Sequence, residues 1–178
     1  MNSHFLENAR FEFNRNKVLA EKAITQLSDE AFEKIPGEES NSVKIIVQHV
    51  AGNLLSRWTD FLTADGEKPW RNRDAEFEQQ SISRKELMQK WEQGWTVLFD
   101  AIDHLQADDV LKNITIRGEK MTVTQAILRQ ISHYSYHVGQ IVFLAKMLAG
   151  KDWKTLSIPK GKSASFVAKG NYTGKNPV

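Results

Sequence analysis

Cysteine is absent from this chain of 178 residues. Without thiols, the protein forms no disulfide bond, has no cysteine nucleophile and offers no thiolate ligand to a metal ion. A divalent transition metal would therefore have to be held by histidine, aspartate or glutamate side chains. This absence directs attention to the five histidines.

Long hydrophobic runs are also missing. No stretch approaches the roughly 20 apolar residues that a membrane-spanning helix needs. The first residues, MNSHFLENARFEF, show no cationic segment followed by an apolar one, which is the pattern of a signal peptide. We therefore expect a cytoplasmic protein with no membrane association. With 40% hydrophobic and 26% charged residues, residues 1–178 have the size and composition of a single domain.

Several familiar motifs are lacking as well. The chain contains no glycine-rich phosphate loop, no H-E-x-x-H, no G-x-S-x-G and no basic DNA-reading helix. The net charge is only +2, although six lysines and one aspartate follow residue 150. Such a basic tail could bind nucleic acid, but its lysines are spread out and no arginine accompanies them. A solvated or docked tail is the preferred interpretation, and nucleic-acid binding is a third, weaker hypothesis.

The clearest helical pattern runs from residue 122 to residue 150. Thr122 and Gln125 form the spacing of a capping box, and Gly150 suits the end of the helix. Apolar residues recur at helical spacing and predict one buried stripe. His133 and His137 are one turn apart along the edge of that stripe.

Three more segments show helical periodicity, at residues 3–27, 42–61 and 83–105. Ser42 is a plausible N-cap, and Ser83 with Glu86 predicts a second capping box. A long loop separates the second and third segments, and alternating β-branched residues around a glycine predict a β-hairpin over residues 110–121. The fold class is therefore all-α: a four-helix bundle with a small β-hairpin before the last long helix. An extended C-terminal tail, residues 151–178, carries apolar anchors that we expect to pack on the bundle or on a partner subunit.

The histidines predict a metal site. His133 and His137, at positions i and i+4, present two imidazoles on one side of a helix, and His49 lies on the flank of the second helix. A bundle could bring all three together, leaving a fourth coordination position open, as in catalytic zinc sites. An H-x-x-x-H pair alone is also compatible with ordinary satisfied or surface histidines, and it is the third histidine that favours a metal.

Other residues complete the set of candidates. Asn53 and Gln130 could orient the ligands, contact a substrate or satisfy each other. Trp70 and Arg71 lie in the long loop, which is of the length that often has a function. By contrast, we expect His4 and His104 to be exposed to solvent. The remaining aromatic candidates are more typical of a core than of a ligand site; they are Trp91 and Trp95.

Four stretches carry a resemblance to a known family. They are SVKIIVQHVAGNLLSRWTDFL, GEKPWRNRD, AILRQISHYSYHVGQIVFLAK and WKTLSIPKGKS. On these the chain resembles the DinB-like superfamily of four-helix-bundle metalloproteins, which includes YfiT-like metal-dependent hydrolases and bacillithiol transferases. It is most similar to a bacterial branch whose members have no assigned activity.

The resemblance implies a divalent ion, zinc or nickel, bound by His49, His133 and His137, and it implies a homodimer. Our first hypothesis is a metal-dependent enzyme, either a thiol S-transferase or a hydrolase acting on a small-molecule substrate. The alternative is a non-catalytic metal-binding bundle with a structural or stress-related binding role. The sequence names neither the native metal nor the substrate.

Overall fold

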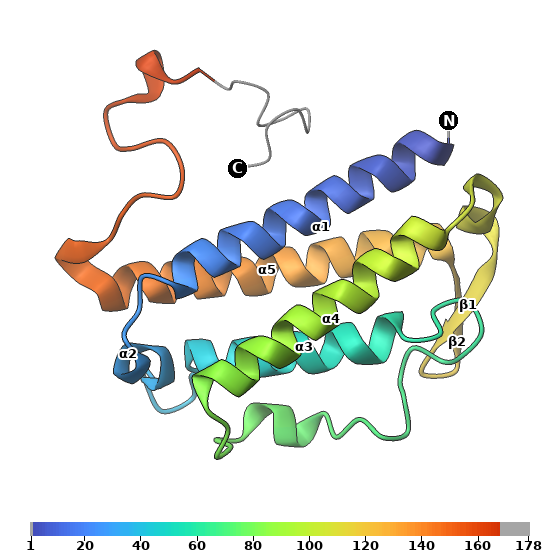
Figure 1. Cartoon of the computed structure of the whole chain (residues 1–178), viewed down its shortest axis with the longest axis horizontal. Coiled ribbons are helices and arrows are strands. Elements are labelled where there is room, and N and C mark those ends of the chain that lie inside the picture. The colour runs from blue at the N-terminus through green and yellow to red at the C-terminus, as the bar shows by residue number, and fades with distance from the viewer. Residues whose placement is uncertain (1, 168–178) are drawn as a thin grey trace.

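The computed structural model describes residues 2–167 of the chain, which are mostly helical (Figure 1). Within that range lie four long α-helices, one short one and a two-stranded hairpin. The α-helices are α1 (Asn2–Ile24), α2 (Asp29–Glu33), α3 (Val43–Trp58), α4 (Arg84–His104) and α5 (Val123–Ala149), and the strands are β1 (Asn113–Ile116) and β2 (Glu119–Thr122). Short 3₁₀ helices are η1 (Asp74–Phe77), η2 (Ala107–Leu111), η3 (Gly150–Asp152) and η4 (Ser163–Ser165).

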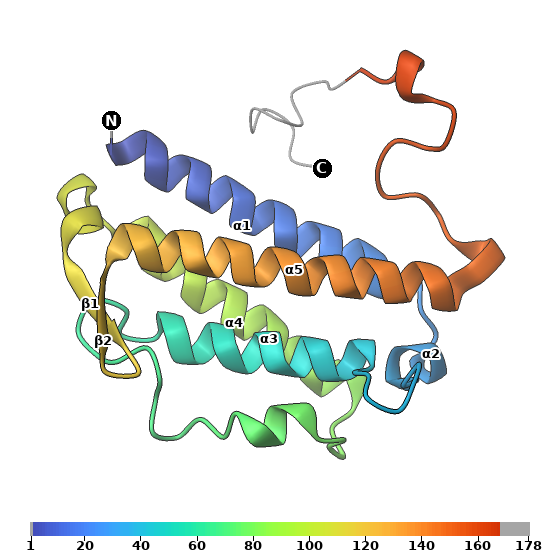
Figure 2. The ribbon, with the colours of Figure 1, turned by 180° about the vertical axis from the view of Figure 1, so that it is seen from behind.

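The long helices share one hydrophobic core. Helix α1 lies along α5 and α3 lies along α4, and contacts of α3 with α5 and of α1 with α4 join the two pairs (Figures 1 and 2). Aromatic rings fill the centre, where Phe13 lies 5.5 Å from Trp58 and Trp95 lies 5.5 Å from Tyr134, measured between ring centroids. None of the helices in residues 2–167 has both the length and the apolar character needed to cross a bilayer.

The predicted helix starts are confirmed by their hydrogen bonds. Ser42 accepts from the backbone N–H of Ile45, and reciprocal capping boxes open α4 and α5. The predicted end of the second helix was wrong, because α3 stops at Trp58 rather than continuing to residue 61. The cause is Asp60, whose φ of 50° is left-handed and breaks the helical path.

The predicted hairpin is present. Strands β1 and β2 pair antiparallel, with Ile116 opposite Glu119, so that Arg117 and Gly118 form a two-residue turn. Both turn residues have positive φ, 56° and 76°, as a type I′ turn requires. Ile114 and Ile116 are buried and attach the hairpin to the core.

The long loop between α3 and α4 is tied to this hairpin. The Asp65 carboxylate accepts hydrogen bonds from the backbone N–H groups of Arg117 and Gly118 at 2.8 and 2.9 Å. The Gly66 N–H donates to the Thr115 carbonyl at 2.8 Å. The loop also contains η1, which the aperiodic sequence did not predict. These bonds tie the loop to the hairpin, and the part of the loop that contains η1 lies along α3 (Figure 2).

The start of the C-terminal tail packs on the bundle. Trp153 and Leu156 contact the core, and the Gln26 amide both donates to and accepts from the Lys154 backbone. Beyond them the chain leads away from the helices (Figure 1). Phe166 is 38% exposed, and the expected packing of the rest of the tail, on the bundle or on a partner subunit, stays a prediction. Residues 168–178 lie outside the described residues; they include Tyr172, one of the apolar residues expected to anchor the tail.

Candidate metal centre

Three histidines from two helices meet beside the core. His49 comes from α3, and His133 and His137 come from successive turns of α5. One ring nitrogen from each lies within 4.8 Å of the others, and the Nε2 atoms of His49 and His133 are 3.4 Å apart. His49 and His137 are buried and His133 is partly buried. The structure thus brings together the three residues that the sequence proposed as ligands.

Hydrogen bonds on the outer side of two rings orient their lone pairs. His49 Nδ1 lies 2.9 Å from a carboxylate oxygen of Glu76, and His137 Nδ1 lies 2.9 Å from Oε1 of Gln140. Both partners are acceptors, so each Nδ1 donates, and the nitrogen of each ring that can offer a lone pair to a metal ion is Nε2. Within residues 2–167, His137 Nε2 has no hydrogen-bond partner, and neither does His133 Nδ1.

Burial favours the neutral form of two of these imidazoles, His133 and His137. Burial, followed by the neighbouring His137 and His49, lowers the pKa of His133 from 6.5 to about 3. Burial also lowers the pKa of His137 to about 4, although its hydrogen bond to Gln140 opposes the shift. At neutral pH these two rings are therefore uncharged, which is the state that binds metal ions.

The geometry fits a metal ion. Two imidazole nitrogens bound to one tetrahedral zinc at about 2.0–2.1 Å would lie about 3.3–3.4 Å apart, and the His49–His133 separation is 3.4 Å. A buried nitrogen without a partner, such as Nε2 of His137, is costly unless something binds it. The three histidines of residues 2–167 could accordingly hold a metal ion.

Glu76 is the functional residue that sequence reasoning missed. It lies in η1, is 7% exposed, and accepts from His49 on one side. The Arg71 guanidinium donates to both of its carboxylate oxygens at 2.7 and 2.8 Å. Burial alone would raise the pKa of Glu76, but the hydrogen bonds from His49 and Arg71 outweigh it and lower the pKa. A carboxylate–histidine pair of this kind orients a ligand and raises its basicity.

Two residues of α3 position Glu76. The Gln48 amide donates to the backbone carbonyls of Ala75 and Glu76, holding η1 on the helix. At Gly52, one turn after His49, an added Cβ would collide with the Glu76 carboxylate. A glycine inside a strong helical pattern often marks such a close approach, and it is the one sequence signal that could have pointed to this contact.

The other proposed residues have different surroundings. Arg71 reaches the site through Glu76, whereas Trp70 is 58% exposed and is not among the residues that line the pocket over the histidines. Asn53 and Gln130 both line that pocket. The Asn53 side chain accepts from the Tyr134 hydroxyl at 3.0 Å, and Gln130 Oε1 has no partner in residues 2–167.

The residues expected to lie outside the site do so. His4 and His104 are exposed, and Nδ1 of His104 donates to a carbonyl of its own helix at 2.6 Å. Trp91 and Trp95 are fully buried in the core, as predicted. Their exclusion leaves His49, His133 and His137 as the histidine cluster of the described residues.

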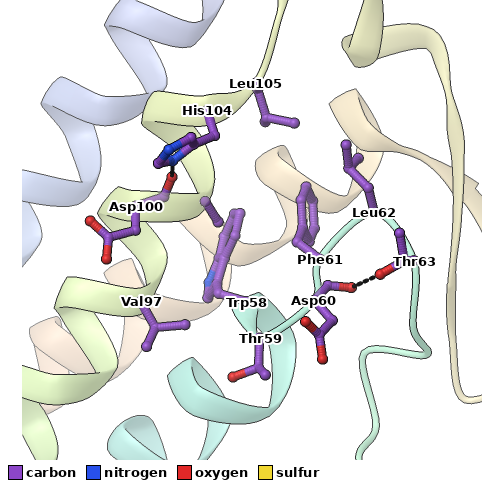
Figure 3. A pocket seen from close by; sticks show the side chains of 11 residues that line it. Trp58, Thr59, Asp60, Phe61, Leu62, Thr63, Val97, Asp100, His104 and Leu105 are labelled. Atoms are coloured by element: carbon purple, nitrogen blue, oxygen red, sulfur yellow. Dashed lines mark hydrogen bonds between the residues drawn. The ribbon is translucent and has the colours of Figure 1, made fainter.

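A pocket of about 410 Å³ opens over the three histidines. Its wall comes from α3, α5, the long loop and the hairpin turn. A second hollow of about 540 Å³ lies between the ends of α3 and α4 (Figure 3). That hollow has an apolar base around Trp58 and Phe61, and its one histidine, His104, is already bonded to the Asp100 carbonyl. The histidine cluster therefore borders the 410 Å³ pocket and not this hollow.

Fold and site together define a mostly helical protein in which α3 and α5 carry a three-histidine cluster able to hold a metal ion. The chain belongs to the DUF1572 family, described as "Protein of unknown function", whose model matches residues 1–162. No curated protein matches the chain.

Proposed function

We propose that this protein is a metal-dependent enzyme with the four-helix-bundle fold of the DinB-like superfamily. It would transfer a low-molecular-weight thiol or hydrolyse a small substrate. The resemblance described above supports this proposal, as do the four long helices around one core. Its metal ligands would be His49, His133 and His137.

One observation carries the proposal: three ring nitrogens, with a pocket of about 410 Å³ above them. A structural zinc site is normally closed by four protein ligands, whereas catalytic sites keep a position free for water or substrate. The pocket gives a small molecule access to the cluster. Its volume lies within the range of small-molecule sites.

A divalent ion at this cluster would supply Lewis acidity, lowering the pKa of a bound water or thiol. The chain's own residues provide the support. Glu76 and Arg71 hold the His49 ring, and Gln140 holds the His137 ring. Gln130 has a free carbonyl oxygen beside the cluster and would orient a substrate there. Three imidazoles suit either zinc or nickel, which are the two ions that we propose.

Metal analysis of tag-free protein tests the site. We expect about one equivalent of a divalent ion in the wild type, and loss of that ion in His49→Ala, His133→Ala and His137→Ala. His104→Ala is the matched control, since this exposed histidine lies outside the cluster and should leave the metal content unchanged. Absence of metal in the wild type after incubation with zinc and nickel would refute the proposal.

Activity separates the enzyme from the structural alternative. The metal-loaded protein is screened with thiol acceptors and with small ester and amide substrates. Turnover that disappears in His133→Ala supports an enzyme. A tightly bound ion without turnover, whose removal lowers the free energy of unfolding, would favour the non-catalytic bundle.

We also propose a homodimer formed through α5. Exposed apolar side chains follow one face of this helix, which is unusual for a surface helix; they are Leu128, Tyr136, Phe143 and Met147. Tyr136 also lines the pocket, so such a dimer would border the site. Analytical ultracentrifugation is expected to show a dimer that Phe143→Glu dissociates. A monomeric wild type at micromolar concentration would contradict this assembly.

A further inference from the structure

Arginine is concentrated around the pocket over the histidines. Five of the eight arginines of the chain line it, and none of the 14 lysines within residues 2–167 does. Among the 13 lining residues there is no aspartate or glutamate. The five are Arg57, Arg71, Arg73, Arg117 and Arg129. A wall of one charge, in a chain with nearly equal numbers of basic and acidic residues, points to a ligand of the opposite charge.

Three of these arginines form ion pairs with a glutamate that does not itself line the pocket. The Glu67 carboxylate forms ion pairs with Arg57 at 2.9 Å, Arg117 at 3.1 Å and Arg71 at 3.4 Å. Arg71 also binds Glu76. The five lining arginines and these two glutamates together carry a charge of +3. The surplus therefore remains available to a bound molecule.

Two of these three charges belong to Arg73 and Arg129. In residues 2–167 neither guanidinium makes an ion pair or a hydrogen bond. Arg73 lies over the Phe77 ring at 5.4 Å from its centroid, and that ring in turn lies 4.6 Å from the ring of His49. This contact keeps the Arg73 guanidinium on the wall of the site.

Arg129 approaches from the other side. It precedes His133 by one turn of α5, and His137 follows by another, so the three share one face of the helix. Arg73 comes from the loop before η1. The two free guanidiniums thus belong to different elements that border the same pocket.

We propose that this pocket binds a small molecule through an anionic group, a carboxylate or a phosphate, held by Arg73 and Arg129. A guanidinium presents two parallel N–H donors that match both of these oxyanions, a geometry that lysine lacks. The use of arginine alone at this wall agrees with that recognition. The inference rests on the proposed function in one respect: the remainder of the molecule would extend towards His49, His133 and His137.

Anion titration tests the proposal with inorganic phosphate and succinate as probes. Binding to the full-length protein is measured by calorimetry at constant ionic strength, in metal-free and zinc-loaded forms. We expect saturable binding to both forms, weakened about tenfold by each of Arg73→Gln and Arg129→Gln. Tighter binding of phosphate or of succinate would identify the group. Arg15→Gln, an exposed arginine on α1, is the control and should bind like the wild type.

The outcomes separate this inference from the metal site. If the protein binds no zinc, yet phosphate or succinate binds and is weakened in the two variants, the metal proposal fails and the anion site stands. If either anion binds only the zinc-loaded form, with equal affinity in the Arg73→Gln/Arg129→Gln double variant, the ion alone holds it and this inference is wrong. Absence of binding, or an equal loss in Arg15→Gln, would also overturn it.

Discussion

The two sides of helix α5 have opposite character. Tyr134 faces the aromatic core, where its hydroxyl accepts from Trp58 at 3.1 Å and donates to Asn53 at 3.0 Å. The adjacent His133 faces the pocket and leaves its Nδ1 unpaired. Of the six buried side-chain atoms without a hydrogen-bond partner in residues 2–167, four belong to residues that line this pocket. Unpaired polar atoms thus collect where a ligand is expected, while the core is largely satisfied by itself.

A cavity in the aromatic core should have the largest effect on the free energy of unfolding. Trp95 is fully buried, and its ring lies 5.5 Å from those of Trp91 and Tyr134. Trp95→Ala is expected to lower the free energy of unfolding by about 3–5 kcal/mol, measured by urea denaturation. The folded fraction should still bind one metal equivalent, because Trp95 is not among the residues that line the pocket over the histidines.

Trp95→Phe serves as the matched control for this cavity. Nε1 of Trp95 is one of the unpaired buried atoms, so phenylalanine loses ring volume but no hydrogen bond. Its cost should be clearly smaller than that of alanine. Equal costs for the two variants would mean that the indole nitrogen, rather than packing, determines stability here.

The second-largest effect should be a loss of stability at low pH, caused by the buried histidines of the site. The pKa values of His133 and His137 in the folded protein, about 3 and about 4, lie below the ordinary 6.5. Above pH 6.5 both histidines are mainly unprotonated in the folded and in the unfolded protein. Below pH 6.5 the unfolded chain takes up these protons before the folded protein does, so the free energy of unfolding falls as the pH decreases. In metal-free protein the expected slope between pH 6 and pH 5 approaches about 1.4 kcal/mol per pH unit for each histidine.

Urea denaturation of the metal-free protein at pH 7.5, 6 and 5 measures this slope. A His133→Gln/His137→Gln double variant should lose most of it, since the two buried titrating groups are gone. The lowest pH is 5, so that the aspartate and glutamate side chains remain ionised throughout the series. A wild-type stability that is constant from pH 7.5 to pH 5 would contradict the burial of these rings.

The contrast between the two sides also explains what sequence predicts well. The helices and hairpin follow from periodic apolar residues and local caps such as Ser42 and Thr122, which act within one turn. The three histidines could be proposed from spacing on those helices, aided by the resemblance. In each case the signal lies within a regular element, where position along the chain determines position on a face.

The surroundings of the histidines were not predictable in this way. Glu76 lies in a loop without periodicity, 27 residues from its partner His49. The arginines of the pocket are scattered between residues 57 and 129, and hydrogen bonds from the hairpin turn to Asp65 bring Arg117 beside the loop. Trp70 and Arg71 are adjacent in sequence, yet one is exposed and the other is buried beside Glu76. Long-range hydrogen bonds decide such positions, and no local pattern encodes them.

Removing the charge behind His49 should have an intermediate effect. In Glu76→Gln the side chain keeps its size but no longer offers His49 and Arg71 a carboxylate. We expect zinc affinity to fall about 10- to 100-fold, measured by competition with a chromophoric chelator. Glu78→Gln, an exposed neighbour, is the control. An unchanged affinity in Glu76→Gln would show that this carboxylate does not support the ligand.

The smallest expected effect comes from a single methyl group at Gly52. Alanine normally stabilises a helix by up to about 1 kcal/mol relative to glycine. Here its Cβ would collide with the Glu76 carboxylate, which His49 and Arg71 hold in place. Gly52→Ala should therefore lower zinc affinity by about tenfold and gain little or no stability.

Gly139→Ala is the matched variant on the other ligand-bearing helix. A Cβ at Gly139 meets no atom within 4 Å, so the helix gains its full propensity and the free energy of unfolding should rise by up to about 1 kcal/mol. Zinc affinity should not change. Because both variants add the same methyl group to a helical glycine, a difference in zinc affinity between them isolates the contact of α3 with Glu76. Equal zinc affinities would mean that Glu76 can move away from His49 without consequence for the metal.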